Sequence, residues 1–165
     1  MTTKRATPLT APPATDWLRL DQQLCFALYS TSLSMTKLYK PLLAPLGLTY
    51  PQYLALLVLW ERDGLTVSEL GERLFLDSGT LTPLLKRMDA AGWITRQRAA
   101  DDERRVLVHL TPDGRALRQQ AKQIPKRLAG AMQCEVSEVQ TLTQRLQQLR
   151  AQLMSGSQDD DSLSH

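Results

Sequence analysis

The chain has 165 residues, of which 42% are hydrophobic, so it is long enough for one domain with a substantial core. Its net charge is +3. No apolar run approaches the roughly 20 residues that span a bilayer, and no apolar segment typical of a secretory signal follows the N-terminus. These features predict a cytoplasmic protein with no membrane partner.

Two cysteines and two histidines offer too few ligands for a structural zinc site, so no cofactor or metal is predicted. Free cysteines in the cytosol are usually small buried hydrophobic residues, which is the simplest interpretation of Cys25 and Cys134. Both thiols are nevertheless candidate redox groups.

The N-terminal third is predicted to contain an arm followed by one long helix. Residues 1–15 carry three prolines and are expected to be disordered. From about Asp16, leucines recur at helical spacing until Pro41, Pro45 and Gly47 end the pattern. We therefore expect a helical segment over 16–48.

Two capping boxes mark the next helices. Thr49 is followed by Gln52, and Thr66 by Glu69, the spacing at which both side chains cap the helix start. The almost wholly apolar stretch 53–60 predicts a buried helix. A turn is expected at 77–79, before a helix with an apolar face that Gly92 ends.

The spacing of apolar residues changes after Gly92, from a helical period to the alternation of a strand. Residues 93–98 and 105–110 are strand-like and flank a polar loop, which predicts a β-hairpin. Two short helices joined by a tight turn and followed by a hairpin indicate a winged helix-turn-helix over 49–110. The fold class is therefore mainly α with a small β-hairpin wing.

The C-terminal region is predicted to be helical. Thr111 caps a helix that runs to about Gly130, with a kink at Pro125. Leucines from 142 to 153 then recur at heptad spacing, typical of a helix that packs on another helix. We expect helices over 111–154, with the last one packing on another helix, and a disordered tail over 155–165.

The helix after the turn has a surface suited to DNA. Opposite its leucines lie small residues and two cations, Lys86 and Arg87, flanked by Thr80 and Thr82. Small residues let a helix enter the major groove, while hydroxyls and cations bond bases or phosphates. An ordinary solvated helix face has the same composition, and the neighbouring wing favours the DNA interpretation.

The loop of the hairpin carries acids before its arginines. Asp102 is placed to hold the Arg104 guanidinium in a bidentate pair and aim it into a minor groove. A charge-mixed solvated turn is the alternative.

Several segments resemble the MarR family of winged-helix repressors: LFLDSGTLTPLLKRM at 74–88, ITR at 94–96, DDERR at 101–105 and LTPDG at 110–114. The segments 24–43 and 48–61 resemble its organic-hydroperoxide-sensing branch, the OhrR type. The resemblance implies a homodimer held by N- and C-terminal helices, double-stranded pseudo-palindromic operator DNA as partner, and organic hydroperoxide as signal.

The resemblance also implies roles for individual residues. Cys25 would be the reactive thiol in a pocket with Tyr39 and Tyr50, and Cys134 would be the resolving thiol from the partner subunit, as in the two-cysteine subtype. DNA contacts would come from the matched recognition-helix residues and the wing-tip arginine: Ser78, Thr80, Thr82, Lys86, Arg87 and Arg104.

Helix geometry adds one constraint on the redox pocket. Tyr29 and Tyr39 each fall within about 40° of Cys25 on a helical wheel, but Cys25 and Tyr39 are about 21 Å apart along one helix. Tyr39 of the same chain therefore cannot touch Cys25, whereas an antiparallel helix of a partner could bring it there.

Three other functions fit parts of this pattern. A repressor released by a small lipophilic or phenolic ligand would need no thiol chemistry. A thiol peroxidase would use Cys25 as a catalytic residue, but this function would not explain the wing and the recognition helix. No enzyme activity is therefore predicted. An architectural DNA-binding protein would not respond to oxidants.

Overall fold

A computed structural model describes residues 18–161, with side chains described to Ser155. The expected disordered arm over 1–15 lies outside these residues, as do 162–165. The chain folds as two compact units, one up to Lys37 and one from Leu38 onward.

The first long helix starts later than the sequence indicates. A 3-10 turn, η1 (Leu20–Gln22), comes first, and α1 spans Leu24–Leu43. The backbone at Gln23 is extended, with ψ 114°, which separates the two elements and explains the later start. Helix α1 contains Pro41, and the 3-10 helix η2 (Ala44–Leu46) follows it and ends at Gly47 with φ +69°.

Helix α2 (Tyr50–Glu61) is the central helix of the core. Both halves of the Thr49–Gln52 capping box are present at its start, as predicted. Its apolar residues are largely buried, and they pack with leucines from α4 and the sheet in one hydrophobic cluster. Burial on most sides follows from the absence of a polar face in this segment.

The helix-turn-helix consists of α3 (Val67–Leu74) and α4 (Ser78–Ala90). The turn lies at Phe75–Asp77, so the prediction of a turn at 77–79 was wrong. Asp77 is the N-cap, and its carboxylate accepts the Thr80 amide N–H at 2.8 Å, which places Ser78 and Gly79 in the first turn of α4.

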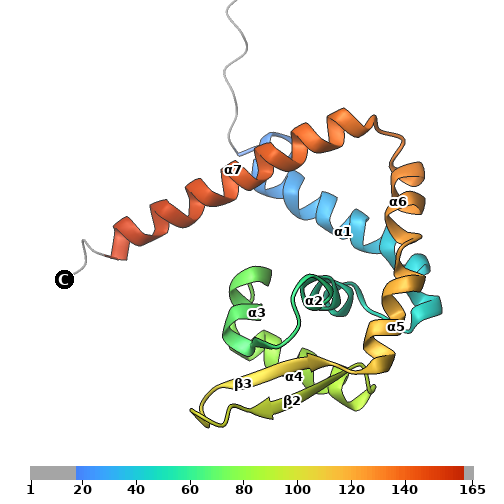
Figure 1. The fold of residues 1–165 in the computed structure, drawn as a ribbon. Coiled ribbons are helices and arrows are strands. Elements are labelled where there is room, and N and C mark those ends of the chain that lie inside the picture. Colours follow the sequence, from blue (N-terminus) through green and yellow to red (C-terminus); the bar gives the residue numbers. More distant parts are fainter. Residues whose placement is uncertain (1–17, 162–165) are drawn as a thin grey trace, which may run out of the picture. The chain divides into compact units, whose positions relative to one another are not determined.

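The wing belongs to a three-stranded antiparallel sheet with strand order β1-β3-β2; Figure 1 labels the two long strands, β2 and β3. Strands β2 (Ile94–Arg98) and β3 (Val106–Leu110) form the expected hairpin, with Ile94 opposite Leu110. Strand β1 (Leu65–Thr66) was not predicted, because two residues are too short to show an alternating pattern. It pairs with β3 and joins the start of α3 to the wing.

The C-terminal region contains three helices rather than the two expected. Helix α5 (Pro112–Ala121) starts at the predicted Thr111 cap, and α6 (Ile124–Met132) is separate from it. Pro125 lies in the first turn of α6, where its missing N–H breaks no helical hydrogen bond, so it begins a helix instead of kinking one.

Helix α7 spans Val136–Asp161. The helix therefore continues past Ser155, where a disordered tail was expected from the end of the apolar pattern. A backbone can remain helical beyond the last apolar side chain. Within 18–161, no single helix is long and apolar enough to cross a membrane; one bent pair, Leu24–Leu46 with Tyr50–Glu61, meets that test of length and composition only when combined.

Candidate functional site

Helix α4 buries one face and exposes the other, as its pattern predicted. Leu81, Leu84, Leu85 and Met88 are buried in the core. Ser78, Thr80, Lys86 and Arg87 are exposed, and Thr82 is partly exposed. The hydroxyl of Thr80 donates to Asp77 at 2.9 Å, and the Thr80 amide and hydroxyl together hold the pKa of Asp77 below its usual value.

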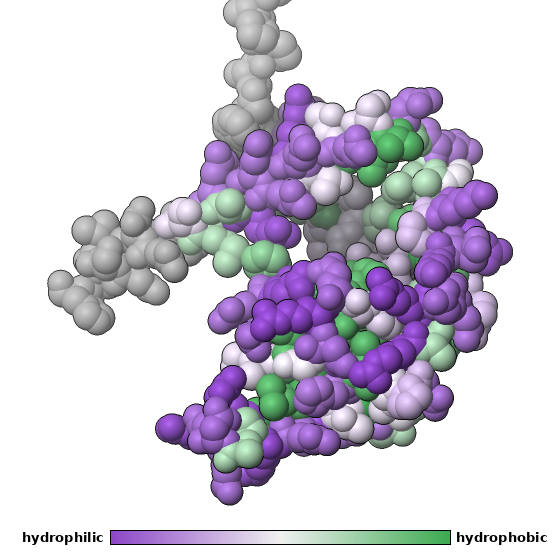
Figure 2. All heavy atoms as spheres, viewed as in Figure 1, coloured by the Kyte–Doolittle hydropathy of each residue, from purple (hydrophilic) through white to green (hydrophobic). Residues whose placement is uncertain are grey.

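A groove of about 530 Å³ separates α4 from the wing. Hydroxyl side chains of β1, α3 and α4 and arginines of the wing line it: Thr66, Ser68, Ser78, Thr82, Arg96, Arg104 and Arg105. Figure 1 shows the hairpin of β2 and β3 beside α4, and Figure 2 shows hydrophilic side chains at the tip of the wing. Cations and hydroxyls around a groove are the groups that bind a phosphate backbone.

Carboxylates orient the three arginines of this groove. Arg96 donates to Asp89 at 3.0 Å, and this pair between β2 and α4 is partly buried. Arg105 pairs with Asp101 at 3.1 Å near the start of β3. Each arginine is thus held by one neighbour while its remaining N–H donors are available for other acceptors.

Arg104 is held differently from the expected bidentate pair. A single oxygen of Asp102, Oδ1, accepts both the Arg104 backbone N–H at 3.0 Å and its Nε at 3.2 Å. The Arg104 side chain is 91% exposed. Asp102 therefore fixes the base of the arginine and leaves its terminal nitrogens in solvent at the tip of the wing.

Of the residues proposed for DNA contact, Ser78, Thr82 and Arg104 line the groove directly. Sequence analysis missed Ser68, Arg96 and Arg105. Arg105 adjoins Arg104 in the same loop segment, and its position suggests the same role. Arg96 lies two residues after the buried Ile94, on the same face of β2, so the alternation of the strand gave no signal for it.

A cluster of aromatic rings joins the end of α1 to α2. The Tyr39 and Tyr50 ring centroids are 4.5 Å apart, and the Tyr39 and Tyr53 centroids are 5.9 Å apart. Burial, with smaller contributions from Tyr50 and Tyr53, raises the pKa of Tyr39 to about 12. Of the three tyrosines proposed for the redox pocket, Tyr39 and Tyr50 lie together, and the buried Tyr53 beside them was not anticipated.

Cys25 and Tyr29 belong to the N-terminal unit, and both are exposed. Because α1 begins at Leu24, Cys25 lies in the first turn, and not in mid-helix as the sequence pattern suggested. Backbone N–H groups of a first turn lack intrahelical partners and favour a negatively charged neighbour. The buried-hydrophobe interpretation does not hold for Cys25 in this chain.

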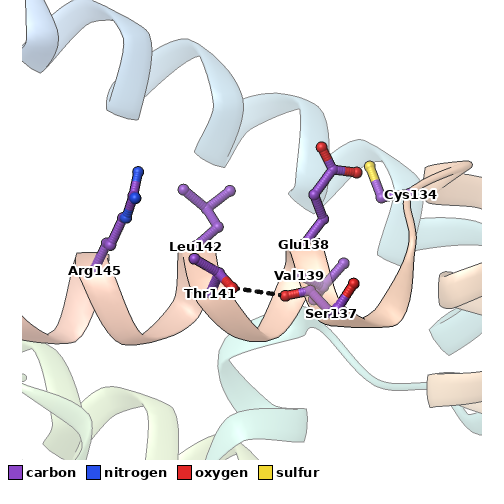
Figure 3. A pocket seen from close by; sticks show the side chains of 7 residues that line it. All are labelled: Cys134, Ser137, Glu138, Val139, Thr141, Leu142 and Arg145. Atoms are coloured by element: carbon purple, nitrogen blue, oxygen red, sulfur yellow. Dashed lines mark hydrogen bonds between the residues drawn. The ribbon is translucent and has the colours of Figure 1, made fainter.

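Cys134 lies in the connection between α6 and α7, after Gln133 with φ +52°. It is exposed, and its Sγ contacts the Met132 carbonyl oxygen at 3.2 Å. A groove of about 460 Å³ extends from it along α7, lined by Glu138, Leu142 and Arg145 among others (Figure 3). The thiol is thus open to reaction at the start of the longest helix of this unit.

Comparison with known proteins agrees with the winged helix-turn-helix fold of this chain. Residues 37–121 match the family described as transcriptional regulator SarA/Rot. The organic hydroperoxide resistance transcriptional regulator of Bacillus subtilis (strain 168) is 58% identical over 115 residues, covering 70% of this chain and 78% of that protein. The chain belongs to this family of winged-helix transcriptional regulators. The resemblance to the MarR family and its organic-hydroperoxide branch is confirmed.

Solved structures of AbfR, a protein of Staphylococcus epidermidis, share the fold. Reduced AbfR bound to DNA matches with a TM-score of 0.68 and 35% identity, over 83% of this chain and 96% of that chain. Disulfide-formed AbfR matches with a TM-score of 0.58 and 34% identity, over 84% and 94%.

Family membership decides the general function. The chain is a DNA-binding transcriptional regulator, and its relatives are regulators and not enzymes. The groove between α4 and the wing is the surface whose chemistry suits DNA.

Proposed function

We propose that this regulator is a homodimeric repressor that binds a pseudo-palindromic operator and releases it when organic hydroperoxide oxidises Cys25. The DNA-binding half of the proposal rests on the groove with three arginines between α4 and the wing. Helix α4 would enter the major groove, with Ser78, Thr80, Thr82, Lys86 and Arg87 toward bases and phosphates, while Arg104 at the tip of the wing would reach the minor groove.

The proposal requires a dimer. Leucines at heptad spacing on α7, including Leu142 and Leu146, are exposed in the single chain. An apolar stripe of this kind on a long helix is typical of a surface that packs on another helix. Two copies of α4 about 34 Å apart would then meet successive major grooves on one side of the DNA.

The redox half rests on the exposure of both thiols. The Cys25 sulfur, as thiolate, would attack the outer peroxide oxygen and form an S–O bond while the O–O bond breaks. The sulfur is oxidised to sulfenic acid, and the peroxide is reduced and leaves as an alkoxide, which takes up a proton from water to give the alcohol. Tyr29 of the same helix and Tyr39 and Tyr50 of the partner would surround the sulfur.

Cys134 of the partner would complete the reaction. Its thiol would attack the Cys25 sulfenic acid, forming an S–S bond and releasing water. A disulfide requires Cα atoms within about 7 Å, so its formation would draw these two segments together. Movement at the dimer interface would change the separation of the two α4 helices and so break their match to the DNA. A relative solved in a disulfide-formed state supports this step.

Fluorescence anisotropy tests the proposal, with a labelled duplex selected from a random-sequence library by the reduced protein. Wild-type protein is expected to release the duplex on addition of cumene hydroperoxide and to bind again after dithiothreitol. Cys25→Ser should bind and fail to respond. A Cys25→Ser protein that still releases DNA would exclude Cys25 as the sensor, and release by a phenolic ligand without oxidation would favour the non-redox alternative.

Non-reducing gel electrophoresis tests the disulfide. Oxidised wild-type protein should run as a covalent dimer, and Cys134→Ala should run as a monomer. A covalent dimer that persists in Cys134→Ala would exclude this residue as the resolving thiol.

A further inference from the structure

A side chain of helix α7, Arg150, contacts the turn of the helix-turn-helix. The guanidinium carbon of Arg150 lies 4.1 Å from the centroid of the Phe75 ring, over its face. This is the geometry of a cation–π interaction, in which the ring face attracts the cation. Both residues belong to the unit that starts at Leu38.

Phe75 occupies a sensitive position in the turn. It ends α3 in the left-handed backbone conformation, with φ +55°, which residues other than glycine rarely adopt. Asp77, only two residues later, caps α4. The turn is also tightly packed, since the Leu76 carbonyl oxygen would lie 2.8 Å from a Cβ added to Gly71. The backbone of Phe75 thus lies between the tightly packed end of α3 and the Asp77 cap of α4.

A second α7 side chain reaches the same region. Met154 lines a groove of about 480 Å³ together with Gly71, Phe75, Asp77 and Ser78. Arg150 and Met154 are four residues apart and so lie on one face of the helix. The face of α7 that carries Arg150 therefore also carries the Met154 side chain that lines this groove.

The other end of α7 adjoins Cys134. The helix begins at Val136, two residues after the cysteine, and continues through Arg150 without interruption. An α-helix is stiff over this length, about 21 Å from Val136 to Arg150. A displacement at Cys134 consequently moves the side chains that contact the turn.

We propose that Arg150 is a positioning residue for DNA binding, which holds the start of the recognition helix α4 through the Phe75 ring. The contact makes α7 the mechanical link between Cys134 and α4; this direction of signalling rests on the redox function proposed above. Arg150 acts through Phe75 and makes no contact with DNA.

The test measures three variants: Arg150→Gln, Phe75→Leu and the double variant that carries both changes. Arg127→Gln is the control, because it removes the same charge from an exposed site on α6. Anisotropy with the selected duplex should show Arg150→Gln and Phe75→Leu each binding about two- to five-fold more weakly, the range for an exposed cation–π contact. The double variant should be no weaker than either single variant, because both remove one interaction. Arg127→Gln should bind like wild type.

Salt dependence separates this role from direct phosphate contact. The slope of log Kd against log salt should be unchanged in Arg150→Gln, and a slope reduced by about one would overturn the proposal. Unchanged affinity in Arg150→Gln would overturn it as well. If Phe75→Leu fails to fold, Arg150→Lys, which keeps the charge and loses the planar stacking group, should still bind more weakly than wild type at an unchanged slope.

Oxidation provides a separate measurement. Cumene hydroperoxide should raise Kd by a smaller factor in Arg150→Gln than in wild type, and an equal factor would exclude α7 as the link. If wild-type protein does not respond to hydroperoxide, the redox function fails, while the reduced-state affinities and the double-variant comparison still decide the positioning role.

Discussion

Tyr39 is difficult to ionise because it is half-buried against two other phenol rings. Burial is the main cause of its pKa of about 12, and the neighbouring tyrosines add to it. Since the folded value lies above the ordinary value of 10.0, the folded state favours the neutral phenol. The stabilisation is complete below about pH 10 and is lost as the pH rises toward 12.

Alkaline titration checks this prediction. The phenolate absorbance of the native protein should show a component that titrates near pH 12, and Tyr39→Phe should lack it. Urea unfolding should show wild-type stability falling between pH 10 and 12, more steeply than in Tyr39→Phe. Identical titration curves for the two proteins would contradict the assignment.

Arg104 is the most exposed arginine among the ion pairs of the described residues. We expect Arg104→Gln to weaken binding of the selected duplex by about ten-fold or more, as for loss of an arginine contact worth about 1–3 kcal/mol. Arg118→Gln, which changes an exposed arginine on α5, should leave affinity near wild type. The thermal midpoint should not change in either variant, and equal affinities would remove the wing tip from the interface.

At the scale of elements, Asp63 joins three segments. Its carboxylate accepts the Gly64 N–H at 2.9 Å after α2, the Leu110 N–H at 2.8 Å at the end of β3, and the Arg115 guanidinium at 2.6 Å on α5. Burial raises the pKa of Asp63, but the hydrogen bonds from Leu110, Arg115 and Gly64 outweigh it and the net pKa is lowered.

Asp63→Asn should therefore destabilise the winged-helix region. Two backbone amides lose a charged acceptor, so we expect a loss of about 1 kcal/mol and a lower thermal midpoint at neutral pH. Because the folded pKa is below 3.8, this contribution is present above that pH and lost as the pH falls below it, so the two proteins should converge in acid. Calorimetry across this range measures the difference, and a constant gap would contradict the linkage.

At the scale of the whole molecule, the exposed leucines of α7 have a testable role. Replacing Leu142 and Leu146 together by lysine should place like charges in a helix–helix interface and yield a monomer in sedimentation experiments. DNA affinity should fall sharply, because a single α4 reads only half of an operator. Gln144→Lys, an exposed position between them, serves as control and should remain dimeric; a dimeric leucine variant would exclude this surface.

Several features could be predicted because neighbouring residues determine them. Features that depend on groups a few residues apart are all present in the structure: the capping boxes at Thr49 and Thr66, the cap at Thr111 and the alternation in β3. The buried and exposed faces of α4 followed from helical spacing in the same way.

Other features depend on contacts between distant segments, which a local pattern does not contain. Strand β1 exists only because β3 pairs with it, and the groove gathers Ser68, Thr82 and Arg96 from three separate elements. The Phe75–Arg150 contact joins residues 75 positions apart along the chain.

The amino-acid order alone determined most of the helices, the hairpin of the wing and the family to which the chain belongs, since backbone hydrogen bonding and apolar periodicity act over a few residues. The tertiary structure decided that Tyr53 joins Tyr39 and Tyr50, and that Arg96 and Arg105 line the groove with Arg104. These arrangements arise only when the core closes, because packing then selects which distant side chains become neighbours.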